Sequence, residues 1–213
     1  MQPLDAGRTR PLEGGPSFSL SNRLVRLLWR ATWLALARFT PPQLHGWRRL
    51  LLRAFGANIG RTAQVWPSAR IWLPSNLDLG ENVLIGPGVE LYNQGHISIG
   101  SYSVISQRAH ICASSHDISD PHFQLVLRPI VIAERCWVAA EAFVGPGVVM
   151  AEGSIAAART ALFNDTEAYG VYRGNPATLV KKRRLAKMEG AGWLRSDAHR
   201  DDLIRLEDEF LMD

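Results

Sequence analysis

Aliphatic residues recur at every sixth position from residue 59 to about residue 166. The positions that open successive hexads fall into blocks of three: Ile59, Val65 and Ile71; Leu79, Ile85 and Leu91; Ile99, Ile105 and Ile111; Ile132, Val138 and Val144. Met150 and Ala156 continue the series. A half-buried strand has a period of two and an amphipathic helix a period of about 3.6, so this pattern indicates a different structure.

A hexad of this kind fits a short strand followed by a sharp corner, repeated three times in each coil. Small residues often follow the opening residue, as in Ile59-Gly60 and Leu79-Gly80, where a corner leaves little room for a side chain. No coil can bury its apolar face alone, so several coils must stack. The repeat therefore predicts a mainly β protein, a parallel β-helix of about five coils over residues 58–170.

Three insertions interrupt the repeat, and all three fall at the same corner. Two residues, 77–78, follow the first coil, two more, 97–98, follow the second, and fifteen, 117–131, follow the third. The third insertion is polar, and His116 is the last residue before it. A long loop on a regular scaffold is where functional residues are expected.

Helices are expected before the repeat. Residues 1–19 contain Pro, Gly, Ser and charged residues, which predicts a flexible N-terminus. The N-terminal helical segment, residues 20–57, is predicted to hold one helix over 21–39 with Ser21 as its N-cap and a short helix over 43–56.

The end of the chain, residues 171–213, is predicted as a separate segment. It contains Gly174-Asn175-Pro176-Ala177 and a basic run that starts at Lys181. Apolar residues spaced among acids predict a C-terminal helix over 195–213.

The first predicted helix, 21–39, carries four arginines among Leu, Trp and Ala. It is too short and too charged to span a bilayer. One interpretation is peripheral contact with an anionic membrane surface, and the other is packing on the β-helix or on a neighbouring subunit. Arg48, Arg49 and Arg53 in the second helix either meet phosphates or form a solvated face.

Composition narrows the class of protein. With 46% hydrophobic and 21% charged residues the chain is not globally disordered, and a net charge of +4 is too mild to indicate a nucleic-acid partner. Cys112 and Cys136 are far apart and form no CxxC motif, which fits a reducing cytoplasm. No secretory signal peptide is predicted. We therefore expect a cytoplasmic protein, with the inner face of the membrane as a further option.

Several stretches besides the repeat are distinctive: Asn22–Trp33, His45–Arg49, Ser115–Pro121, Cys136–Val148 and Gly174–Ala177. Together with the repeat they resemble the left-handed β-helix acyltransferases, also called hexapeptide-repeat transferases, and in particular the colanic-acid and exopolysaccharide O-acetyltransferases. The resemblance covers roughly residues 18–185. Left-handed winding is implied by the resemblance alone, since the usual crossover rule predicts the opposite hand.

The resemblance implies a homotrimer that binds acetyl-CoA between neighbouring β-helices and acetylates a sugar hydroxyl in glycan biosynthesis. His116 matches the family histidine that acts as general base. A neutral imidazole can take the proton of a hydroxyl as that hydroxyl attacks the thioester. The acceptor would be a sugar or a lipid-linked glycan. The alternative for His116 is an ordinary surface histidine.

Three further residues are candidates for contact with the acceptor. Asn93 matches a family asparagine that binds the acceptor, and it is expected one coil below His116. Asp117 is expected to orient His116 or the acceptor hydroxyls, and Tyr92, stacked on Trp72, is a candidate sugar platform. The alternatives are solvated corner residues and a packed aromatic pair.

Candidate acetyl-CoA contacts lie later in the chain. Small residues let a ligand approach the backbone, and basic residues bind the 3′-phosphate. The matching positions are Trp137 at the thiol end, Ala139 and Ala157 along the pantetheine arm, and Lys181, Lys182 and Arg183 at the phosphate. A packed tryptophan and a solvated basic run are the alternatives.

Two other functions stay open at the sequence level. The first is acetylation of a small acceptor such as serine, a free sugar or an antibiotic. The second is a non-acetylating, zinc-binding β-helix that uses His96, His110 and His116. His110 and His116 close successive hexads and so belong to different corners, unlike a compact zinc site. We therefore expect no metal.

Overall fold

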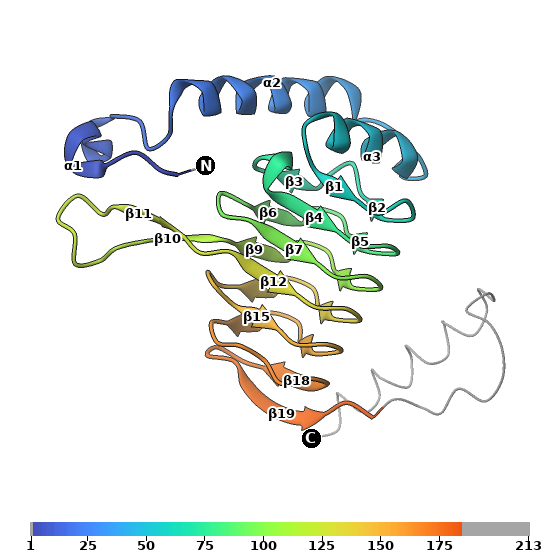
Figure 1. The fold of residues 1–213 in the computed structure, drawn as a ribbon. Coiled ribbons are helices and arrows are strands. Elements are labelled where there is room, and N and C mark those ends of the chain that lie inside the picture. Colours follow the sequence, from blue (N-terminus) through green and yellow to red (C-terminus); the bar gives the residue numbers. More distant parts are fainter. Residues whose placement is uncertain (1, 185–213) are drawn as a thin grey trace. The chain divides into compact units, whose positions relative to one another are not determined.

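Short strands alternate among three parallel sheets and wind the middle of the chain into a β-solenoid of about six turns (Figure 1). The structure is a computed structural model that describes residues 2–184. The first sheet contains β1 (Asn58–Ile59), β4 (Leu77–Leu79), β7 (Ile97–Ile99), β12 (Ile130–Ile132) and β15 (Val149–Met150). The third contains β3 (Arg70–Ile71), β6 (Glu90–Tyr92), β9 (His110–Cys112), β14 (Phe143–Val144) and β17 (Ala161–Leu162).

The second sheet is longer than the other two. Its parallel strands are β2 (Gln64–Val65), β5 (Leu84–Ile85), β8 (Val104–Ile105), β13 (Trp137–Val138), β16 (Ile155–Ala156) and β18 (Gly170–Arg173). The last strand, β19 (Thr178–Lys182), pairs antiparallel with β18. The stack therefore extends beyond the five coils predicted, and residues 171–182 belong to it rather than to a separate segment.

The residues that open the hexads stack directly above one another. Leu79 pairs with Ile59 on one side and with Ile99 on the other, and all three are buried. A Cβ atom on Gly60 would lie 2.5 Å from the carbonyl oxygen of Gly80, so only glycine fits at that corner. The six-residue period is thus confirmed as the repeat of the solenoid. Its left-handed winding stays a prediction.

All three insertions leave the stack between the third and first sheets, as predicted. The short helix η2 (Pro74–Asn76) fills this corner in the first coil. In the third coil the insertion is a hairpin of β10 (Ser114–His116) and β11 (Leu125–Leu127), in which His116 pairs with Leu125. The insertion is therefore not a plain loop over 117–131, because its first strand begins before residue 117.

Two helices cover the N-terminal end of the stack (Figure 1). In α2 (Leu20–Leu36), the side chain of Ser19 rather than Ser21 caps the helix, by accepting from the backbone N–H of Asn22. Trp29 and Trp33 are buried, and the Trp29 Nε1–H donates to the carbonyl oxygen of Ile71 at 2.8 Å. One face of α2 thus packs on the first coil.

The arginines of α3 (His45–Ala54) bind backbone carbonyls of the first coil. Arg48 is fully buried, and its guanidinium donates to Val65 and to the carbonyls of Pro41 and Pro42. Arg49 donates to Ala63, and Arg53 to Ile59. The sequence analysis offered two interpretations of these arginines, a phosphate contact or a solvated face, and neither fits Arg48. This buried residue instead links α3 to the first coil.

The N-terminal residues contain two short helices, and the expected flexibility of residues 1–19 stays a prediction. They form α1 (Ala6–Thr9) and η1 (Pro11–Glu13) beside the β10–β11 hairpin (Figure 1). The Ala6 N–H donates to Gln124 Oε1 at 2.7 Å, and Gln124 Nε2 donates to the carbonyl of Leu4. One hairpin side chain therefore holds a segment more than a hundred residues away in sequence. The helix expected over 195–213 lies outside the described residues.

Candidate active site

A cavity of about 590 Å³ opens where the N-terminal segment, α2, the third sheet and the hairpin meet. It joins residues that are distant in sequence, because α2 crosses the end of the stack and the hairpin projects from its side. The cavity is lined by residues 14–18, Arg23, Arg26, Trp72, Tyr92, Gln94, Cys112, residues 114–116 and Leu125. Of the predicted site residues, His116 and Tyr92 lie here together.

The hairpin fixes both the position and the tautomer of His116. Its Nδ1 lies 2.6 Å from the carbonyl oxygen of Phe123, on the opposite side of the hairpin. A carbonyl oxygen only accepts hydrogen bonds, so in the neutral ring the proton is on Nδ1 and Nε2 carries the lone pair. The exposed imidazole is therefore oriented to accept a proton through Nε2.

Aromatic rings form one wall of the cavity. Trp72 lies 5.0 Å from Phe18 and 6.5 Å from Tyr92, measured between ring centroids. The Tyr92 hydroxyl accepts from Gln94 Nε2 at 2.8 Å, and burial raises the pKa of the Tyr92 phenol, which therefore keeps its proton. Such a wall can receive the apolar face of a sugar ring. Tyr92 lies next to Trp72 in the neighbouring coil, as predicted, with the two rings edge to face, and its role as a platform stays a prediction.

Two arginines from α2 make the cavity positively charged. The Arg26 guanidinium lies 4.2 Å from the centre of the Trp72 ring, and its Nε donates to Asn22 Oδ1. Burial lowers the pKa of Arg26, but a guanidinium stays protonated at any physiological pH. Arg23 lies one turn earlier and also lines the cavity. No carboxylate is among the lining residues.

Gln94 brings an unsatisfied acceptor to the same cavity. The residue is 7% exposed, and its Oε1 atom is buried without a donor in the described part of the chain. A buried acceptor without a partner favours a water or a ligand hydroxyl nearby.

Asn93 lies beneath this wall rather than in the cavity. It is fully buried, its Oδ1 accepts from the backbone N–H groups of Trp72 and Leu73, and its Nδ2 donates to the Leu73 carbonyl. All of this bonding is to the corner of the preceding coil. The structure therefore gives Asn93 a structural role in the corner of the preceding coil, and its contact with the acceptor stays a prediction.

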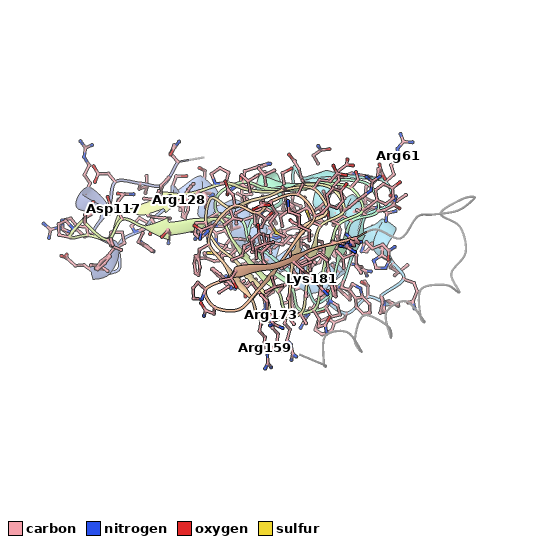
Figure 2. The ribbon with its side chains drawn as sticks, turned by 90° about the horizontal axis from the view of Figure 1, so that it is seen from below. Arg61, Asp117, Arg128, Arg159, Arg173 and Lys181 are labelled. Atoms are coloured by element: carbon pink, nitrogen blue, oxygen red, sulfur yellow. The ribbon has the colours of Figure 1, made fainter. Side chains whose placement is uncertain are left out.

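Asp117 lies just beyond His116 but does not orient it. Its Oδ1 accepts from the backbone N–H and the hydroxyl of Ser119, and these hydrogen bonds lower the pKa of the Asp117 carboxyl. The orienting acceptor for His116 is the carbonyl of Phe123. Asp117 thus shapes the exposed tip of the hairpin, where Figure 2 shows it.

The chain is similar to acetyltransferases of known sequence and structure. It is 41% identical over 166 residues to the putative colanic acid biosynthesis acetyltransferase WcaF of Escherichia coli K12, a match that covers 78% of this chain and 91% of that protein. The chain belongs to the hexapeptide-repeat acetyltransferase family. It is an acetyltransferase. No protein-family model matches the chain.

Solved structures of this family share the fold. A maltose O-acetyltransferase of Clostridium difficile 630 matches with a TM-score of 0.71 at 19% identity, over 78% of this chain and 90% of that one. A hexapeptide-repeat acetyltransferase of Vibrio cholerae, solved with acetyl coenzyme A, matches with a TM-score of 0.69 at 20% identity, over 77% and 90%.

The expected acetyl-CoA contacts of this acetyltransferase lie at another corner of the solenoid. Ala139 follows β13 and Ala157 follows β16, so both lie where the second sheet turns into the third. The His116 hairpin leaves between the third and first sheets. Trp137 is half-buried on the second sheet, where its Nε1–H donates to Ser106 Oγ at 2.8 Å. Within one chain, these residues and His116 are not brought together.

The basic residues expected at the phosphate belong to the end of the second sheet. Lys182 pairs with Glu167 at 2.9 Å, and that carboxylate raises the pKa of Lys182. Arg183 donates to the carbonyl of Arg135 at 3.4 Å. Figure 2 shows Lys181 near Arg173 and Arg159, far from Asp117. The sequence analysis did not single out Arg159, which follows β16 and pairs with Glu141 at 2.7 Å, or Arg173 at the end of β18.

The histidines considered for zinc have separate surroundings. His96 pairs with Asp78 at 2.9 Å, and His110 packs edge-on between Tyr92 and Phe143. In the part of the chain that the structure describes, no three His, Cys, Asp or Glu side chains converge as a metal site would require.

Proposed function

We propose that this enzyme transfers the acetyl group of acetyl-CoA to a hydroxyl of a sugar in glycan biosynthesis, with His116 as the general base. The observation that carries the proposal is the hydrogen bond from His116 Nδ1 to the carbonyl of Phe123, which leaves Nε2 as the basic nitrogen of a residue that lines the cavity. The similarity to WcaF, described as a putative colanic acid biosynthesis acetyltransferase, supports a polysaccharide precursor as acceptor.

In this mechanism the sugar ring rests on the Trp72–Tyr92 wall with one hydroxyl at His116. As the hydroxyl oxygen attacks the thioester carbonyl, Nε2 takes the hydroxyl proton. The tetrahedral intermediate then collapses, the acetyl ester forms and the carbon–sulfur bond breaks. The imidazolium returns the proton to the departing thiolate, so the products are an acetylated sugar and CoA. No acyl-enzyme is needed, and Cys112 and Cys136 have no covalent role.

We further propose that the working enzyme is a homotrimer whose sites combine two chains. His116 and the Ala139–Ala157 corner lie on different edges of one solenoid. Packing solenoids side by side would bring the hairpin of one chain to the small-residue corner of the next, with the thioester between them. Ala139 and Ala157 would then flank the pantetheine arm, and Lys181, Arg173 and Arg183 would face the phosphates.

Turnover with defined acceptors tests the proposed function. Acetyl-CoA is incubated with a panel of sugars, glycosides, nucleotide sugars, serine and chloramphenicol, and the acetylated product is identified by mass spectrometry. We expect a sugar O-acetyl ester, and its loss in the His116→Ala variant. Acetylation of serine or chloramphenicol with no sugar product would contradict the proposal in favour of a small acceptor.

A further inference from the structure

We propose that the acceptor carries an anionic group, a phosphate ester or a carboxylate, that Arg23 and Arg26 bind inside the His116 cavity. This inference deepens the proposed function and rests on it, since it assigns the acceptor to this cavity. It concerns the acceptor only, because the acetyl-CoA candidates lie at another corner of the solenoid.

Arg26 is held in place before any ligand arrives. Its guanidinium lies over the Trp72 ring at 4.2 Å and near the Phe18 ring at 5.6 Å, and its Nε is bound by Asn22. Within residues 2–184 no hydrogen bond or ion pair holds its two terminal nitrogens, so they are available to the cavity. A stacked guanidinium loses little side-chain freedom on binding, which favours recognition of an anion.

Arg23 adds a second charge to the same place. Arg23 and Arg26 are three residues apart on α2, so they lie on one face of the helix, and both line the cavity. Neither forms a salt bridge within the described chain, and no lining residue is acidic. Two close positive charges without a counter-charge repel each other, and an anionic ligand would relieve that repulsion.

The two arginines and His116 line the same cavity, which suits one ligand with two functional parts. Arg26 lies over Trp72, Trp72 contacts Tyr92, and both rings line the cavity together with His116. An acceptor sugar on this wall would therefore place its hydroxyl at His116 and its anionic group at α2. A glycosyl phosphate, a nucleotide- or lipid-linked sugar diphosphate, and a uronic acid all have this chemistry.

Matched acceptors and variants test the inference. Three derivatives of one sugar are compared by thiol release from acetyl-CoA: a neutral methyl glycoside, the glycosyl phosphate and the uronide. We expect kcat/KM for at least one anionic derivative to exceed that for the neutral one by about tenfold to a hundredfold, as charge-assisted hydrogen bonds usually give. The better of the two anionic arms identifies the group as phosphate or carboxylate.

The variants separate this inference from the proposed function. Arg23→Gln should reduce the anionic-to-neutral ratio of kcat/KM to near one-tenth of its wild-type value, whereas Arg30→Gln, which is exposed on α2 outside the cavity, should keep it. Equal use of neutral and anionic sugars, or an unchanged ratio in Arg23→Gln, overturns the anion subsite while leaving sugar acetylation intact. No transfer to any sugar would instead remove the proposed function.

A different observation carries a second inference. We propose that the outer face of α2 rests on an anionic lipid surface. Asn22, Trp29 and Trp33 face the first coil, and at 3.6 residues per turn a row of leucines falls on the opposite side. These leucines are 56–66% exposed: Leu20, Leu24, Leu27, Leu28 and Leu34.

Charge favours a lipid surface over a second protein chain. Residues 14–77 contain nine arginines and no acidic residue, although the whole chain has a net charge of only +4. Arg23 and Arg30 flank the leucine row, so two copies joined through this face would bring like charges together. An apolar helix face flanked by arginines instead fits the interface of an anionic bilayer. Within residues 2–184, no helix has the length and apolar character needed to cross a bilayer.

Co-sedimentation with vesicles tests the lipid contact. The full-length protein should sediment with phosphatidylcholine vesicles that contain phosphatidylglycerol, and binding should fall at least about tenfold in Leu24→Glu/Leu27→Glu, because two charges then enter the apolar boundary. Ile118→Glu, on the exposed hairpin tip, is the matched control and should bind normally. Equal binding of both variants, no binding by the wild type, or leucine-dependent self-association without vesicles would overturn the proposal.

Discussion

At the scale of single residues, the position of a residue along the repeat was a better guide to the candidate site than its chemical type. His116 stood out because it is the last residue before the longest insertion, and the structure places it in a cavity with its Nε2 available. Asn93 was expected one coil below His116 on the same flank. Its side-chain amide, however, forms hydrogen bonds with the backbone of Trp72 and Leu73 at the corner of the preceding coil. A single sequence does not distinguish an amide that binds the backbone from one that binds a ligand.

Replacement of Asn93 separates these two roles. Asn93→Ala leaves the N–H of Leu73 buried without a partner and leaves the Leu73 carbonyl with the Asn76 N–H as its donor, so we expect the free energy of unfolding to fall by about 2–3 kcal/mol. Urea denaturation measures this change. Unaltered stability with a raised KM for the acceptor would instead support a contact with substrate.

Glu81 gives stability a defined dependence on pH. Its carboxylate accepts from the Thr62 hydroxyl and from the N–H groups of Thr62 and Arg61, and these bonds lower its pKa to about 2. A lowered pKa means that the stabilisation is full above the unfolded-state value of 4.5 and is lost as pH falls toward 2. The difference in denaturation midpoint between wild type and Glu81→Gln should therefore shrink from pH 5 to pH 2. A constant difference would contradict this assignment.

At the scale of elements, the N-terminal part of the chain was the hardest to predict. The capped helix at 20–36 and the short one that ends before Gly56 follow from local spacing and caps, so sequence located both. Residues 2–18 have no such periodicity, and their fold depends on Gln124 of the distant hairpin. The absence of acidic residues from 14 to 77 is the sequence feature that accords with the proposed anion subsite.

Arg48 links α3 to the first coil, and its removal should weaken that junction. Arg48→Met removes the charge-assisted hydrogen bonds that the buried guanidinium donates to the carbonyls of Val65 and Pro41, so we expect a loss of about 3 kcal/mol in unfolding free energy. Arg49→Met is a suitable control, because Arg49 makes one bond, to Ala63, at the partly buried edge. Thermal or urea denaturation of both should show the larger loss at Arg48. Equal losses would contradict the cross-link.

At the scale of the whole molecule, the six-residue period gives the stacked coils, and the three insertions interrupt them at one shared corner. Both features could be predicted from the sequence, because the same pattern of apolar and small residues recurs in each coil. The strand pair β18–β19 was not predicted, since it lacks the repeat and closes the sheet in the antiparallel sense. The proposed trimer follows from the separation of His116 from the small-residue corner.

Mixed trimers test that composite site. Ala157→Trp should block the pantetheine path, and His116→Ala should remove the base, so each variant alone should be inactive. Co-expression in equal amounts should restore activity at about a quarter of the sites, because random assembly pairs intact halves that often. Light scattering should give three times the 23.6 kDa chain mass. No recovery, or a monomeric mass with full activity, would contradict a shared site.

The measurement that tests the central claim most directly is single-turnover acetyl transfer to the best sugar acceptor by wild type and His116→Gln. If Nε2 accepts the hydroxyl proton, the rate of transfer should fall by about 10²–10⁴-fold, while the affinity for acetyl-CoA stays within about twofold by calorimetry. A His116→Gln enzyme that transfers acetyl within about threefold of the wild-type rate would show that another group takes the proton.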